Sequence, residues 1–182
     1  MPKILPEIDY QKLFESVPGD YLILLPDFTI VAVTDAYANV TMTKRENIIG
    51  KSIFEVFPDD PNDPNSHNVA RLTVSFNRVL EKKEPDLVPI FKYNIKKPAS
   101  EGGEFEDRYW SPHNYPVIKD GEVILIIHTV TDVTQKMHTD NELVTKIAEL
   151  EKMNAVMIGR ELKMAELKKE LEEFKAKKEI HG

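Results

Sequence analysis

The sequence predicts an α+β fold in which a five-stranded antiparallel sheet with short flanking helices is followed by one long helix. Three observations predict this fold. Short apolar runs lie before and after a block of helical patterning, as expected when helices interrupt an antiparallel sheet. The dipeptide Asp120-Gly121 is a strong signal for a two-residue hairpin between the last two strands. From Gln135 to about Lys178 the chain has no proline and is rich in Glu, Lys, Leu, Met and Ala, which favours a long helix.

The composition bounds the function. Of 182 residues, 41% are hydrophobic and 30% are charged, and the net charge is −7 without a cluster of Lys and Arg. These values argue against nucleic-acid binding. The absence of cysteine excludes disulfides, thiolate metal sites, cysteine nucleophiles and cysteinyl-flavin photochemistry. No segment approaches the ~20 apolar residues of a membrane span, and the N-terminus lacks a signal-peptide core, so we expect a cytoplasmic protein without membrane insertion.

The first elements are short. Residues 8–16 form a short amphipathic pattern that Pro18-Gly19 ends. The apolar runs 21–25 and 29–33 flank a Pro-Asp turn and predict a β-hairpin. Asp35 is expected to cap the helix that follows it.

Three more helical segments follow. Thr43 and Glu46 are spaced as a capping box before a short helix that Gly50 closes. Residues 52–57 predict one further turn. A longer helix, capped by Asn65 or Ser66, is expected to reach about Lys83 and to present one apolar face made of Val69, Leu72, Phe76, Val79 and Leu80.

Three strands complete the predicted sheet. They are expected at residues 88–95, at 105–111 or on to 117, and at 123–130. The last of these is apolar and β-branched, which indicates a buried strand.

Several of these segments resemble a PAS domain. Residues 29–59, TIVAVTDAYANVTMTKRENIIGKSIFEVFPD, resemble its first half, and residues 105–134, FEDRYWSPHNYPVIKDGEVILIIHTVTDVT, resemble its closing strands. Asp132-Val133-Thr134 matches the Asp-[Ile/Val]-Thr signature where PAS domains pass into an output helix. FPDDP and RYWSP are similar to a group of bacterial sensor PAS domains, and residues 153–173 resemble the helical linker of bacterial sensor kinases. The resemblance covers about residues 8–178.

The resemblance implies three parts: an N-terminal flanking helix at 1–18, a PAS sensor domain at 19–134 and a coiled-coil output helix at 135–182. It implies a sensory module of a two-component system that transmits a signal through Asp132, Val133 and Thr134. The chain has neither a His-Glu-x-x-x-Pro phosphoacceptor motif nor a Gly-rich ATP lid, and His138 stands in a different context. We therefore expect no kinase activity from these residues, whether they are a fragment or a stand-alone adaptor.

Six residues are candidates for contact with a ligand, namely Phe76, Arg71, Tyr93, Arg108, Trp110 and His128. Each has a structural alternative. For Trp110 the favoured alternative is core or interface packing, and for His128 a hydrogen-bonded core position is favoured over a metal or haem ligand. The two arginines could equally be surface charge. His67 stands on the helix that carries the axial histidine in haem-binding PAS domains, but at its cap, so haem is disfavoured. No metal spacing is present, and the ligand itself stays open.

The long helix carries a heptad seam with spacings of three and four, interrupted only by Arg160. We interpret this seam as the interface of a homodimer, preferably a parallel two-stranded coiled coil, although the pattern does not fix strand direction. The alternative is that the helix packs back on its own sheet. The seam residues are Leu150, Met153, Met157, Met164, Leu167, Leu171 and Phe174.

Three functional hypotheses follow. The first is a signalling module that binds a small molecule or a partner and transmits its state to the coiled coil. The second is a dimerisation and interaction scaffold that binds no ligand. The third is an enzyme, and it is disfavoured because the sequence offers no nucleophile with a base and no paired carboxylates on adjacent strand positions.

Overall fold

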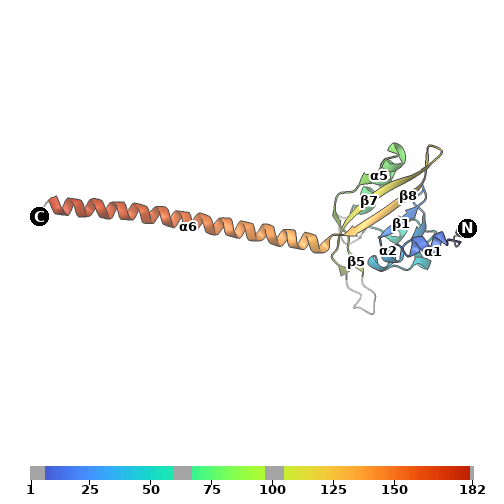
Figure 1. Cartoon of the computed structure of the whole chain (residues 1–182), viewed down its shortest axis with the longest axis horizontal. Coiled ribbons are helices and arrows are strands. Elements are labelled where there is room, and N and C mark those ends of the chain that lie inside the picture. The colour runs from blue at the N-terminus through green and yellow to red at the C-terminus, as the bar shows by residue number, and fades with distance from the viewer. Residues whose placement is uncertain (1–6, 60–66, 97–104, 181–182) are drawn as a thin grey trace, which may run out of the picture. The chain divides into compact units, whose positions relative to one another are not determined.

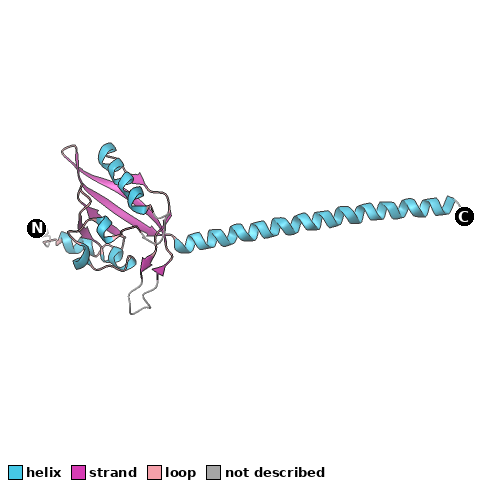
Figure 2. Ribbon diagram, turned by 180° about the vertical axis from the view of Figure 1, so that it is seen from behind, coloured by secondary structure: helices cyan, strands magenta, loops and turns pink. Residues whose placement is uncertain are grey.

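The computed structural model describes residues 7–59, 67–96 and 105–180. The chain divides into two compact units, Met1–Gln135 and Lys136–Gly182. The first unit is an α+β domain and the second consists of helix (Figures 1 and 2). The predicted fold class is confirmed.

The first unit is built on a six-stranded antiparallel sheet. Its central strands are the two longest, and they form the predicted hairpin at Asp120-Gly121, where both residues have positive φ, 52° and 81°. The strand order is β2-β1-β8-β7-β3, with β4 also pairing with β7. The strands are β1 (Tyr21–Leu24), β2 (Ile30–Val33), β3 (Asp86–Leu87), β4 (Phe91–Lys92), β7 (Tyr109–Lys119) and β8 (Glu122–Asp132).

The prediction of one continuous strand at 88–95 is wrong. Between β3, which ends at Leu87, and β5 (Ile95–Lys96), only β4 is a strand, and β5 pairs with β6 (Phe105–Glu106) in a separate two-stranded sheet. Pro89 stands between β3 and β4, where its missing N–H cannot contribute to a ladder. The next predicted strand is likewise divided, and β7 begins only at Tyr109 but extends beyond 117.

Five helices lie wholly within the described part of the first unit, and α5 packs on the sheet. Along α5 the buried residues Leu72, Phe76 and Val79 form the predicted apolar face, and the helix contacts β7 and β8 (Figure 1). On β1 and β8 alternate residues are buried, including Leu22, Leu24 and Ile126, which is the pattern of strands with one face in the core. The helices are α1 (Tyr10–Glu15), α2 (Asp35–Val40), α3 (Arg45–Ile48), α4 (Ile53–Val56) and α5 (Asn68–Lys82).

One predicted cap is replaced, and another prediction lies outside the described residues. α3 has Lys44 at its N-cap without a side-chain hydrogen bond, and Thr43 lies against the hydroxyl of Thr41 instead. At α5, the side chain of Asp59 accepts hydrogen bonds from the amides of Asn68 and Val69. The predicted caps Asn65 and Ser66 lie outside the described residues.

The cap of α2 is Thr34 and not Asp35 as predicted. The hydroxyl of Thr34 accepts hydrogen bonds from the amides of Tyr21 and Tyr37 and donates one to the carbonyl of Gly19 at 2.8 Å. Thr34 is fully buried, so this one hydroxyl joins β1, β2 and α2. Asp35 forms an ion pair with Arg45.

Replacement of Thr34 with valine is therefore expected to lower the free energy of unfolding by roughly 2–4 kcal/mol, because it leaves buried amide and carbonyl groups without partners. Urea unfolding of the domain measures this loss. Thr34→Ser keeps the hydroxyl and serves as the control, with most of the stability retained. Equal stability of the valine variant and the native chain would contradict the assignment.

The second unit belongs to α6 (Thr134–Ile180), a helix of 47 residues that begins within the last residues of the first unit. The predicted long helix is confirmed. The described seam side chains have exposed fractions of 50–59%, so they are open to a partner, and their pairing stays a prediction. The side chain of Phe174 lies outside the described part. No described helix is long and apolar enough to cross a membrane.

Candidate ligand-binding site

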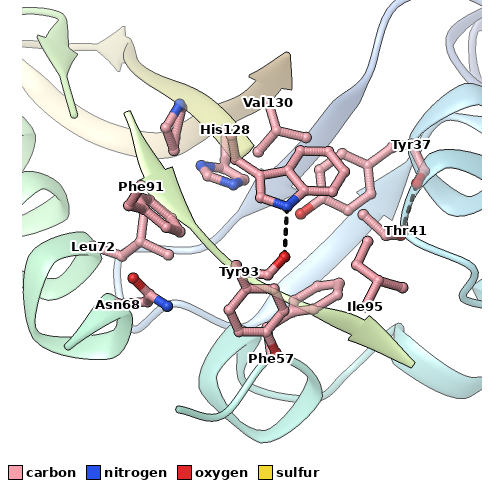
Figure 3. A pocket seen from close by; sticks show the side chains of 12 residues that line it. Tyr37, Thr41, Phe57, Asn68, Leu72, Phe91, Tyr93, Ile95, His128 and Val130 are labelled. Carbon is pink, nitrogen blue, oxygen red and sulfur yellow. Dashed lines mark hydrogen bonds between the residues drawn. The ribbon is translucent and has the colours of Figure 1, made fainter. Parts of the chain in front are cut away.

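A cavity of about 50 Å³ lies in the domain between the helices and the sheet. Its wall is apolar apart from a few polar groups, and its volume has room for roughly three water molecules. Figure 3 shows Tyr37 and His128 close together at one side and Phe57 and Asn68 at the other. The lining residues are Tyr37, Thr41, Phe57, Asn68, Leu72, Phe91, Tyr93, Ile95, Trp110, Pro112, His128 and Val130.

The sheet positions this wall through the alternation of β7 and β8. Trp110, Pro112 and Asn114 are buried on β7, and His128 and Val130 on β8. Pro112 is paired with Val130 and Asn114 with His128 across the two strands. The indole Nε1 of Trp110 donates a hydrogen bond to the carbonyl of Tyr93 at 3.1 Å, which fixes the indole ring between β7 and β4 (Figure 3).

His128 is held by a chain of short hydrogen bonds that leads from the cavity to the surface. Its Nδ1 lies 2.7 Å from Oδ1 of Asn114, whose Nδ2 donates to Oγ of Ser75 at 2.7 Å. Ser75 donates to Asp86 at 2.6 Å, and Asp86 forms an ion pair with Arg78. We call these five residues the buried polar chain. It joins β8, β7, α5 and β3 through side chains alone.

The directions of these hydrogen bonds follow from the carboxylate. Partial burial raises the pKa of Asp86, but hydrogen bonds from Ser75 and Arg78 and the charges of Arg78 and Lys82 outweigh this, so its pKa is lowered. A carboxylate only accepts, so Ser75 donates to it and accepts from the amide of Asn114. The carbonyl oxygen of Asn114 then faces His128, which must carry its proton on Nδ1.

His128 and Tyr37 are both neutral in the cavity. Burial lowers the pKa of His128 to about 3. Burial, followed by the charges of Tyr93 and Asp20, raises the pKa of Tyr37 far above its ordinary value. The cavity therefore presents a bare imidazole nitrogen and a phenol, and neither carries a charge at neutral pH.

The shifted pKa of His128 predicts a pH dependence of stability. Unfolded, this histidine binds a proton near its ordinary pKa of 6.5; folded, it does so only near 3. Between these values the unfolded chain binds more protons, so the free energy of unfolding falls as the pH falls. The expected loss from pH 7 to pH 5 is roughly 2 kcal/mol. Chemical denaturation at several pH values measures it.

The comparison variant is His128→Leu, in which this contribution to the slope should vanish even though its overall stability is lower. His138→Gln, on α6, removes a histidine outside the domain and should keep the slope. A His128→Leu chain with the native pH dependence would show that another group titrates.

The structure places the six sequence-predicted ligand residues differently. Tyr93, Trp110 and His128 line the cavity. Phe76 is fully buried beside it, with its ring centroid 5.6 Å from that of His128. Arg71 is on the exposed side of α5 and Arg108 is at the end of the sheet, so neither contributes to the cavity wall.

Tyr37, Phe57 and Asn68 were not among the sequence-predicted candidates. Tyr37 stands within a recognisable motif, but the direction of its side chain depends on how the short helix α2 packs. For Asn68 a weak signal exists, because it is a polar residue at the start of the apolar face of α5. His67, the residue considered for haem, is exposed, and the described residues contain no group of three or more potential metal ligands.

A second set of contacts lies at the end of β8. Asp132 forms an ion pair with Arg108 at 3.0 Å and accepts a hydrogen bond from the amide of Thr134 at 2.9 Å. Thr134 accepts through its hydroxyl from the amide of Tyr109, whose carbonyl accepts from the amide of Val133. The first residue of α6 is thus joined to the first residue of β7.

The junction concentrates charge. Arg108 forms a second ion pair with Glu106 at 3.1 Å. Partial burial and then the charge of Asp132 raise the pKa of Asp20 above its ordinary value. Asp20 and Asp132 repel each other. The Arg108 guanidinium, which is paired with Asp132, offsets this repulsion and stabilises the Asp132 carboxylate at the junction.

An antiparallel sheet, covering helices and a cavity between them define an α+β domain, and comparison with known proteins gives the family. The family model described as "PAS fold" matches residues 14–137. The chain belongs to the PAS fold family, whose members are sensory and signalling modules, and the resemblance in the sequence is confirmed. No curated protein matches the chain.

Solved structures show the same fold. The PAS domain of BvgS from Bordetella pertussis aligns with a TM-score of 0.51 at 20% identity, covering 79% of this chain and 94% of that one. A PAS domain from Colwellia psychrerythraea aligns with a TM-score of 0.51 at 11% identity, covering 68% and 93%. A sensory box sensor histidine kinase from Vibrio cholerae aligns with a TM-score of 0.45 at 21% identity, covering 69% and 89%. The likeness to the first two concerns the fold alone, and nothing is inferred from the third.

Proposed function

We propose that this chain is a non-catalytic sensory module that binds a small molecule in the cavity and passes the bound state through Asp132-Val133-Thr134 to a dimeric coiled coil. One observation carries the proposal. The two strands that line the cavity are the same two strands that hold the start of α6. A shift of these strands when a ligand binds in the cavity is therefore passed to α6 through only a few residues of backbone.

On β7, the residue that lines the cavity and the residue that contacts the junction are adjacent in sequence. Trp110 lines the cavity and Tyr109 precedes it, with its amide and carbonyl both bonded to the junction. A ligand that displaces the indole, or breaks its hydrogen bond to Tyr93, shifts the backbone that positions Thr134. On β8, Val130 lines the cavity two residues before Asp132.

The energy required is small. A coiled coil with methionines and one arginine in its seam is marginal, so two packing arrangements of similar free energy are expected. A ligand then shifts their populations by its difference in affinity for the two states. A difference of about 1.4 kcal/mol changes the ratio tenfold.

The setting that we propose is that of the bacterial sensors that the sequence resembles. There a homodimeric, cytoplasmic PAS module controls the output of a two-component system. The present residues contain the sensory part and the helix, and the output would come from another region or partner.

A ligand-free scaffold is the second candidate function. The observation that favours it is the cavity volume of about 50 Å³, which is far below the several hundred Å³ that enclose a drug-sized ligand. On this view the packed aromatic side chains are only a core, and dimerisation through α6 is the whole function.

Native mass spectrometry of the full chain, with an absorption spectrum of the same sample, separates these functions. A dimer that carries added mass supports the sensory module, and the absorption spectrum identifies a coloured ligand. The scaffold is supported by two results together: a dimer without added mass, and α6–α6 spin-label distances that do not change when a compound binds the domain. These two results overturn the sensory proposal.

A further inference from the structure

Two polar atoms of residues that line the cavity have no hydrogen bond to the described residues. They are Nε2 of His128 and the hydroxyl oxygen of Tyr37, and both side chains are only 2% exposed. Their rings lie 6.1 Å apart between centroids, and Figure 3 shows the Tyr37 hydroxyl directed into the cavity. A polar atom that loses its hydrogen bond to water is costly to leave unpaired, so a molecule bound in the cavity is favoured if it forms hydrogen bonds with both atoms.

The buried polar chain determines which hydrogen bond His128 can form with a molecule in the cavity. Because the Asp86 carboxylate orients Ser75, and Ser75 orients Asn114, the imidazole proton is held on Nδ1. Nε2 is then an acceptor only. The Tyr37 hydroxyl, which stays protonated, is free to donate.

The charge of the wall restricts the ligand further. Among the described residues, no Lys, Arg, Asp or Glu lines the cavity. An anion would find no cation to pair with and would meet the lone pair of Nε2, and a cation would lack a carboxylate. Arg71 and Arg108, the two charged residues among the sequence-predicted ligand candidates, lie elsewhere.

We propose that the cavity recognises a compact uncharged molecule that donates a hydrogen bond from a hydroxyl or an amide N–H to Nε2 of His128 and accepts one from the hydroxyl of Tyr37. This inference rests on the proposed sensory function and names the chemical class of its ligand. The volume of about 50 Å³ limits the buried portion to a few non-hydrogen atoms.

The test uses the full chain labelled with ¹⁵N and follows the imidazole nitrogens of His128 by NMR. Isopropanol and acetamide are the neutral donor probes, acetone is a matched neutral molecule without a donor, and acetate and methylammonium carry charge. We expect Nδ1 to carry the proton in the free protein, and saturable millimolar binding of both donor probes with a shift at Nε2. Acetone and the two ions should bind at least about tenfold more weakly, since each lacks the donor or is penalised for its charge.

Two variants locate the effect. Ser75→Ala interrupts the buried polar chain, so the Asn114 amide is free to turn, and we expect a mixture of His128 tautomers with weaker binding of isopropanol. Tyr37→Phe keeps the ring but removes the hydroxyl, and it should weaken acetamide and isopropanol without changing the tautomer. Arg71→Ala, an exposed change on the same helix as Ser75, is the control. It should alter neither the His128 tautomer nor the affinity for the probes.

Three results would overturn the inference: a proton on Nε2 in the free protein, acetone or acetate binding as tightly as isopropanol, or native affinity in Tyr37→Phe. Failure of this inference is distinguishable from failure of the proposed function. A charged compound that co-purifies in the cavity contradicts the ligand class but supports a sensor, whereas no added mass and no binding of any probe contradicts both.

Discussion

A chain with alanine in place of Asp132 is expected to fold and to bind ligand as the native chain does, but to lose control over its output. The readout is a fusion of the chain to a histidine-kinase catalytic region, in which ligand changes the rate of autophosphorylation. We expect the ligand response of the variant to fall at least about tenfold, which corresponds to the loss of roughly 1.4 kcal/mol of coupling free energy.

The physical reason is that Asp132 holds both sides of the junction. Its carboxylate binds Arg108 on the β7 side and the amide of Thr134 on the α6 side. Without it, α6 loses a hydrogen bond in its first turn, and movement of β7 no longer reaches the helix through this side chain. The ion pair is partly exposed, so the cost to domain stability is only about 1 kcal/mol.

Two further variants make the result specific. Asp132→Asn keeps an acceptor for the Thr134 amide and loses the ion pair, so an intermediate response is expected. Asp35→Ala removes an exposed carboxylate that is paired with an arginine at 2.6 Å but lies on α2, and the response should be native. Unchanged ligand control in the Asp132→Ala fusion would contradict the coupling role.

Those parts of the fold that depend on local chemistry are predictable from the sequence. Asp120-Gly121 specifies its hairpin because two successive residues with positive φ favour this dipeptide over most others. α6 follows from composition alone, since no proline or apolar cluster competes with the helix. The division of the strand at 88–95 was also available in the sequence, because Pro89 lies within it.

The cavity was less accessible to sequence reasoning because its wall comes from distant segments. Tyr37 and His128 are neighbours only after β1 and α2 have packed on β8. The sequence does not separate Thr34 from Asp35 as the cap of α2, since both residue types cap helices and only packing shows which one is buried. The role of His128 depends on Ser75 and Asn114, which carry no signal of their own.

The double variant Met157→Lys, Met164→Lys is expected to convert the protein from a dimer to a monomer. Both residues belong to the predicted seam, and both are exposed in the single chain, by 52% and 59%. In a two-stranded coiled coil these substitutions place four lysines in the interface. Loss of about 1.5 kcal/mol of apolar burial at each position weakens the dimer by about 6 kcal/mol, or roughly ten thousandfold. Sedimentation equilibrium measures the dissociation constant.

The control places the same charges one residue further along the same helix. Ile158→Lys with Ala165→Lys carries an identical change in charge, and lysine is a good helix former at all four positions, but these two positions lie outside the heptad seam. We expect this variant to remain a dimer. If the native chain is a monomer, the heptad interpretation is wrong. If only the control dissociates, α6 dimerises through the face formed by Ile158, and the register inferred from the methionines must be replaced by one displaced by a single residue.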